Sequence, residues 1–212
     1  MSSILQFTEQ NFVSLCNELA HKETALASII EQYGYPPLWK RDPGFETLVH
    51  IILEQQVSLA SAKAAFDKLK NKLGRVTPEN IILLTNEELR ACYLSRQKTM
   101  YVQHLATAIV SKKINLNKLT YESDDKVREA LVSLKGIGNW TADVYLMMAL
   151  QRTDLFPIGD IALINSIKTE MQLPTATTKD AIVALANNWQ PYRSIATYLF
   201  WHAYLCKRKR TM

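Results

Sequence analysis

The chain has 212 residues, of which 48% are hydrophobic, and it carries a net charge of +5. A chain of this length can bury a core as one large domain or two lobes, and its basic charge suits a polyanionic partner. No apolar stretch is long enough to span a membrane and no secretory signal opens the chain, so we expect an intracellular protein without a membrane partner. Three widely spaced cysteines argue against a disulfide framework and a metal cage: Cys16, Cys92 and Cys206.

Apolar residues recur at helical spacing through most of the chain. Between residues 44 and 54 they occupy positions 0, +3, +4 and +7, namely Phe45, Leu48, Val49 and Ile52. A similar stripe runs from Ala62 to Leu73 and ends at Gly74, a residue type common after a helix C-terminus. No segment shows the alternation of a strand. The sequence therefore predicts an all-α protein of about ten helices.

Two glycines separate the next pair of predicted helices. The first of these helices carries an apolar stripe that ends at Leu134, and the second begins after Gly138. Glycine at 136 and 138 permits a tight turn and a close approach of a second backbone. The N–H groups and the positive dipole at the start of the second helix form a phosphate site, beside which Lys135 is a further candidate contact.

Several motifs resemble those of one protein family. The stretch Leu-Lys-Gly-Ile-Gly-Asn-Trp-Thr-Ala-Asp at 134–143 resembles the helix-hairpin-helix of the DNA glycosylase superfamily, and Pro157 with Asp160 resembles the element that follows it. Ile-Leu-Glu-Gln-Gln-Val-Ser at 52–58 resembles the segment that carries a DNA-inserting wedge. Trp-Gln-Pro-Tyr-Arg-Ser at 189–194 resembles a signature of the alkylated-base branch, the 3-methyladenine DNA glycosylase II family.

The resemblance implies an architecture and an activity. Two helical lobes would flank a DNA-binding cleft: residues 44–157 with the wedge and the hairpin, and residues 1–43 plus 158–212 with the catalytic aspartate. The implied protein is a monomeric, DNA-associated base-excision repair enzyme that binds damaged duplex DNA. It would hydrolyse the N-glycosidic bond of alkylated purines of the 3-methyladenine type and leave an abasic site. The resemblance implies no cofactor, apart from a monovalent cation that some hairpins of the family hold.

Asp160 is the catalytic candidate, because it matches the position of the family's aspartate. Cleavage of the glycosidic bond builds positive charge on the sugar, which a fixed carboxylate stabilises. Such a carboxylate also orients or deprotonates water. The alternative is an N-cap, since aspartate often starts a helix and an apolar stripe follows Asp160. Both roles are compatible.

Trp140 occupies the position at which strand-cutting relatives carry a lysine nucleophile. Tryptophan has no amine, so the resemblance implies a monofunctional enzyme, and the indole face suits stacking on an extruded, cationic base. A core tryptophan is the alternative. Tyr198 and Trp201 are further candidates for the base pocket, although a core location is the favoured interpretation for both.

Three polar residues are candidate DNA contacts. Gln55 and Gln56 occupy the wedge segment, and Gln56 matches a position that is leucine in some relatives. Either they fill the space left by an extruded base or they end a helix in solvent. Arg193 is a candidate phosphate contact, with a structural ion pair as the equal alternative.

Other functions remain open at this point. A non-catalytic helix-hairpin-helix module would need the two glycines but neither Asp160 nor the wedge. A glycosylase for another damaged or mismatched base would keep the same motifs. A purely structural helical protein would show similar stripes, with the glycines as a chance turn.

Overall fold

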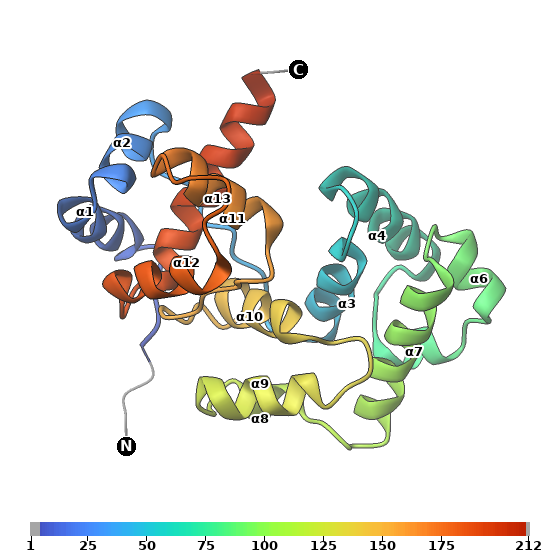
Figure 1. Ribbon diagram of the computed structural model, residues 1–212. Helices are drawn as coiled ribbons and strands as arrows, with labels where there is room; N and C mark the ends of the chain where they lie inside the picture. Colours follow the sequence, from blue (N-terminus) through green and yellow to red (C-terminus); the bar gives the residue numbers. More distant parts are fainter. Residues whose placement is uncertain (1–4, 211–212) are drawn as a thin grey trace. The chain divides into compact units, whose positions relative to one another are not determined.

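The computed structural model describes residues 5–210, and the side chains of residues 5–208 (Figure 1). Within this part of the chain there are thirteen α-helices and one 3-10 helix but no β-strand, only an isolated bridge between Gln6 and Arg152. The prediction of an all-α fold is therefore confirmed. The chain divides into two compact units: a central unit, Arg41–Leu150, and a terminal unit, Met1–Lys40 with Gln151–Met212.

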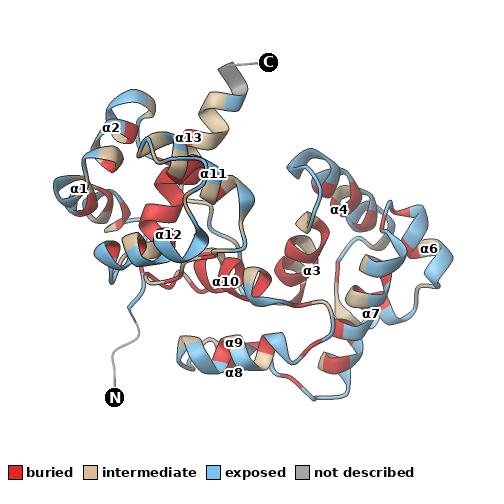
Figure 2. Ribbon diagram, in the orientation of Figure 1, coloured by how far each residue is buried: buried red, intermediate tan, exposed pale blue. Residues whose placement is uncertain are grey.

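The central unit is built around a helix that is buried on nearly every side. This helix, α3 (Phe45–Glu54), packs against α4, α7 and α10, and Figure 2 shows it almost wholly as buried ribbon. Seven of its ten residues are buried, including Ile51, Ile52 and Leu53, while its polar residues Glu46, His50 and Glu54 share one side of the helix. The other helices of this unit are α4 (Leu59–Leu73), α5 (Pro78–Ile82), α6 (Asn86–Ala91), α7 (Arg96–Val110), α8 (Leu116–Leu119), α9 (Asp124–Val132) and α10 (Asn139–Met148).

The terminal unit is built around α13 (Arg193–Arg210), which packs against α1, α2 and α11. The N-terminal segment and the segment that follows the central unit meet here, where Phe7 N donates to Gln151 O at 2.9 Å. The stretch of α13 from Ser194 to Phe200 is fully buried. Its other elements are α1 (Phe12–Lys22), α2 (Thr24–Tyr33), α11 (Ile161–Glu170), α12 (Lys179–Ala186) and the 3-10 helix η1 (Asn187–Trp189).

The observed division differs from the predicted lobes in its boundaries. These fall at 40/41 and 150/151, earlier than the expected 43/44 and 157/158, so Pro157 belongs to the terminal unit. The helix count is also higher than predicted. The additional helices α5, α6 and α8 have only 5, 6 and 4 residues, too few to display a 3.6-residue period.

Candidate functional site

The hairpin forms as predicted, and its two glycines have different surroundings. Gly136 has a φ of +92°, and a Cβ on it would lie 2.1 Å from the ring of Tyr101 in α7. Only glycine fits that position. Gly138 is the N-cap of α10, and no atom lies within 4 Å of where its Cβ would be. The start of α10 is therefore uncovered beside Gly138, and Lys135 is exposed in the same loop.

An ion pair braces the two helices of the hairpin. Arg128 of α9 donates from Nε and Nη2 to Asp143 Oδ1 of α10, at 3.1 and 2.7 Å. Asp143 is only 7% exposed, so solvent screens this pair less than a surface pair. Arg128 was not predicted from the sequence, because a partner fifteen residues away leaves no local signal.

The wedge turn, residues 55–58, connects α3 to α4. Its two glutamines lie in different surroundings. Gln56 is exposed and has a φ of +57°, a left-handed conformation that costs a non-glycine residue about 1–2 kcal/mol. Gln55 is half-buried, and its Nε2 donates to Gly136 O and to Thr141 Oγ1, both at 2.9 Å. The Gln55 amide is therefore bonded to the hairpin, and the DNA contact predicted for this residue stays a prediction.

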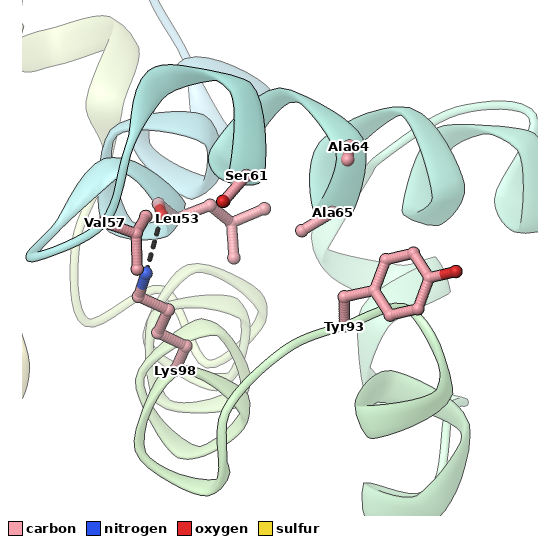
Figure 3. A pocket seen from close by; sticks show the side chains of 7 residues that line it. All are labelled: Leu53, Val57, Ser61, Ala64, Ala65, Tyr93 and Lys98. Atoms are coloured by element: carbon pink, nitrogen blue, oxygen red, sulfur yellow. Dashed lines mark hydrogen bonds between the residues drawn. The ribbon is translucent and has the colours of Figure 1, made fainter.

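A second contact holds the start of the wedge turn. Lys98 of α7 donates from Nζ to Leu53 O at 2.6 Å, as the dashed line in Figure 3 shows. Burial lowers the pKa of Lys98 from its usual value. One residue further along α3, Glu54 accepts at both oxygens from Nη1 and Nη2 of Arg41, at 3.1 and 2.7 Å. The last turn of α3 is thus fixed from two directions.

A pocket of about 290 Å³ lies beside the wedge turn within the central unit. Lys98, Val57 and Tyr93 line it, together with small side chains of α4, as Figure 3 shows. Its lining is mostly apolar.

Trp140 lies in the first turn of α10 and is half-buried, whereas every residue from Thr141 to Met147 is buried. Part of its surface is therefore accessible at the helix end, next to the uncovered start of α10. This position is compatible with stacking on a ligand and is less enclosed than a core position.

Asp160 is the N-cap of α11 in the terminal unit. Its Oδ1 accepts a hydrogen bond from Leu163 N at 2.8 Å, which is the capping interaction expected as the alternative role. The same bond fixes the carboxylate, and the residue is half-buried. Capping and catalysis therefore remain compatible, since a catalytic carboxylate has to be held in place.

Arg193 forms a structural ion pair, which was the alternative to a phosphate contact. It donates from Nε and Nη2 to the two carboxylate oxygens of Asp154, at 2.7 and 2.9 Å. In the neighbouring position, the buried Ser194 Oγ accepts from Leu155 N at 2.9 Å. These bonds fasten the segment around Asp154 to the start of α13. The DNA contact by Arg193 stays a prediction.

The pocket candidates Tyr198 and Trp201 lie in an aromatic cluster of the terminal unit. Tyr198 is fully buried, Trp201 is 9% exposed, and the Tyr198 hydroxyl donates to Trp39 O at 3.1 Å. This agrees with the core location that was favoured for both. Trp39 is half-buried at 6.4 Å from Trp201, centroid to centroid, and had not been predicted. Its signal in the sequence is an aromatic residue in a proline-bounded loop.

The side chains and helices of the described residues bear on cofactors and membranes. No group of three or more histidine, cysteine, aspartate or glutamate side chains is arranged to hold a metal ion there. No helix among these residues is long and apolar enough to cross a membrane. The monovalent cation at the hairpin stays a prediction.

Comparison with known proteins decides the family. Residues 49–191, which include the wedge turn, the hairpin and Asp160, match the model of the HhH-GPD superfamily base excision DNA repair protein. The chain belongs to this superfamily. As an HhH-GPD protein it is 30% identical to DNA-3-methyladenine glycosylase 1 of Schizosaccharomyces pombe over 166 residues, which cover 76% of this chain and 72% of that protein.

Solved structures agree with the family assignment. The S. pombe 3-methyladenine DNA glycosylase in complex with abasic DNA superimposes on this HhH-GPD protein with a TM-score of 0.83 and 26% identity, covering 89% of this chain and 95% of that one. A DNA-3-methyladenine glycosidase from Bacillus halodurans gives a TM-score of 0.74 at 26% identity, covering 97% and 94%. The likeness therefore extends over both units of the fold.

Proposed function

We propose that this HhH-GPD protein is a DNA glycosylase that hydrolyses the N-glycosidic bond of alkylated purines in duplex DNA and leaves an abasic site. The observation that carries this proposal is the match to the S. pombe 3-methyladenine enzyme, which is similar over most of both chains. As a repair enzyme it acts on DNA inside the cell, and we expect it to act as a monomer.

Asp160 supplies the charge that the reaction needs. As the bond to the base breaks, positive charge develops at C1′ of the deoxyribose, and a fixed carboxylate lowers the energy of that state. The hydrogen bond from Leu163 N holds Oδ1 in place, so the carboxylate does not have to be reorganised during the reaction. The carboxylate also orients the attacking water.

Alkylated purines carry a positive charge on the base, which makes them good leaving groups. An enzyme for such substrates needs little general-acid activation, and an aromatic face recognises the cation. Trp140, half-exposed at the start of α10, provides that face. It brings no amine, so water is the nucleophile and the DNA strand stays intact. No cofactor is required for either step.

The hairpin and the wedge turn bind the duplex. The N-terminus of α10 at Gly138 receives a backbone phosphate, with Lys135 as a nearby cation. Gln56, exposed at the tip of the wedge turn, fills the space left by the extruded base. These contacts carry little sequence information, as a repair enzyme requires.

The test is release of free bases from a methylated duplex, quantified by chromatography. We expect 3-methyladenine and 7-methylguanine to appear, and no base from the same unmodified duplex. Duplex binding without any released base would favour the alternative, a non-catalytic helix-hairpin-helix module. Release only from duplexes with oxidised or mismatched bases would show a DNA glycosylase with a different substrate.

A further inference from the structure

The side chain of Gln55 connects the wedge turn to the hairpin. Its Nε2 reaches both Gly136 O in the hairpin loop and Thr141 Oγ1 in the first turn of α10, at 2.9 Å each. Thr141 is 1% exposed, so this contact is protected from water at one end. The residue next to the predicted wedge is thus bonded to the element that binds phosphate.

Helix α7 supports both of these elements from one side. Lys98 Nζ holds Leu53 O just before the wedge turn, and the Tyr101 ring packs on Gly136 so closely that no Cβ fits between them. Gln97 donates to the Tyr101 hydroxyl and orients that ring. Helix α7 therefore contacts both the hairpin loop and the end of α3 that leads into the wedge turn, and Gln55 joins the wedge turn to the hairpin loop.

The wedge turn needs such support because of its backbone. Gln56 has a φ of +57°, a conformation that a glutamine leaves when the surrounding structure does not impose it. The bonds of Gln55 and Lys98 hold the backbone at residues 55 and 53, directly before Gln56, and so support this conformation. Loss of one bond should let the exposed Gln56 sample other positions.

We propose that Gln55 is a positioning residue that couples phosphate binding at the hairpin to insertion by Gln56. When a phosphate fixes the hairpin loop, the Gln55 amide transmits that position to the wedge turn. Lys98 is the second anchor of the same turn. This inference rests on the proposed function, since it assigns Gln55 a role in extrusion of the damaged base.

A double-mutant cycle tests the coupling. Gln55→Met keeps the length of the side chain but removes the amide donor. We expect it to slow excision of a lesion in a paired duplex about tenfold more than excision of the same lesion in an unpaired bubble. In a Gln56→Ala background the further loss on the paired duplex should be less than about twofold, because Gln55 acts through Gln56.

Controls separate positioning from folding. Gln103→Met makes the same substitution elsewhere in the central unit, where Gln103 Nε2 donates to Leu84 O at 3.4 Å. It should leave the ratio of the excision rates on the paired and unpaired substrates unchanged. If Gln55→Met does not fold, Thr141→Val removes one acceptor with almost no change in shape. It should also slow excision from the paired duplex more than excision from the unpaired bubble. Equal losses on both substrates, or losses that multiply in the double mutant, would overturn the proposal.

A readout without chemistry keeps this inference separate from the proposed function. In a duplex with 2-aminopurine beside an abasic-site analogue, insertion unstacks the fluorophore and raises its emission. The wild-type protein and Gln103→Met should raise the emission, and Gln55→Met should not. Emission that rises equally with all three would contradict the positioning role, whether or not the protein releases bases.

Discussion

Asp154 and Asp160 lie close together in the chain, yet their surroundings suit them to different tasks. Asp154 shares both carboxylate oxygens with the guanidinium of Arg193. Asp160 contacts the backbone N–H of Leu163 at the start of α11. We propose Asp160 as the catalytic group because it matches the position of the family's aspartate, whereas Asp154 fastens its segment to the start of α13.

At Trp140 we predict a loss of activity with little loss of stability. Trp140→Ala removes the stacking face, which contributes about 1–3 kcal/mol per base, so single-turnover excision should fall by about 10- to 100-fold. Trp140→Phe should recover part of that loss, because a smaller aromatic face remains. Loss of the thermal transition in both variants, or full activity of Trp140→Ala, would instead indicate a core residue.

Trp140 also leads to a prediction about the product. With no amine at this position, borohydride should trap no covalent protein–DNA adduct while a methylated base is being released. The abasic strand should be cut only after alkali is added. Efficient trapping would show that a lysine elsewhere reaches the sugar, and the monofunctional interpretation would be wrong.

The sequence predicts some site residues without predicting their distant partners. The sequence identified Gln55 and Arg193, but their partners, Gly136 and Asp154, are 81 and 39 positions away. Periodicity reports which face of a helix is buried and carries no information on which distant atom a polar side chain reaches. For the same reason Tyr101 and Trp39 were missed, since an isolated aromatic residue has no local signature of what it packs against.

At the scale of elements, the hairpin depends on two glycines for two separate reasons. Gly136→Ala must place a Cβ into the Tyr101 ring at a positive φ, so it should lower the melting temperature and displace the hairpin loop. Gly138→Ala meets open space and should fold normally. Its methyl group would occupy the surface that a phosphate approaches, so duplex affinity should fall equally for all sequences.

Thermal unfolding and duplex titration check this pair of variants. The expected result is a stability defect confined to Gly136→Ala and a binding defect in the folded Gly138→Ala. A Gly138→Ala protein that binds duplex as well as wild type would argue against phosphate binding at the start of α10.

Helices were predictable from the sequence wherever an apolar stripe was long enough. The stripe at 45–52 corresponds to α3, and the stripe that ends at Gly74 corresponds to α4 with Gly74 as its C-cap at a φ of +69°. The short helix α6 shows why others were missed. Its six residues are held by a capping box of Thr85 and Glu88 rather than by an amphipathic period.

At the scale of the whole molecule, stability should depend on pH through a buried thiol. Burial raises the pKa of Cys16 to about 12, from 9.0 for the unperturbed thiol. The unfolded chain therefore loses this proton at a lower pH than the folded protein, and stability falls as the pH rises from about 9 to about 12. The Cys16 thiol contributes up to about 4 kcal/mol to this decrease in the free energy of unfolding.

Urea unfolding at several pH values checks this prediction. In Cys16→Ala the free energy of unfolding should fall less steeply between pH 9 and pH 11 than in the wild-type protein, because one titrating group has been removed. Cys206→Ala, at a half-buried position, serves as the control. Parallel curves for wild type and Cys16→Ala would show that the thiol is not protected by burial.

Single-turnover excision from a methylated duplex by wild type, Asp160→Asn and Asp154→Asn tests the central claim most directly. Asparagine caps a helix as well as aspartate, so Asp160→Asn should stay folded and bind duplex while its excision rate falls by at least about 100-fold. Asp154→Asn weakens the pair with Arg193 and should melt earlier, yet excise within a few-fold of wild type. Excision by folded Asp160→Asn within a few-fold of wild type would contradict the account and leave Asp160 as a helix cap.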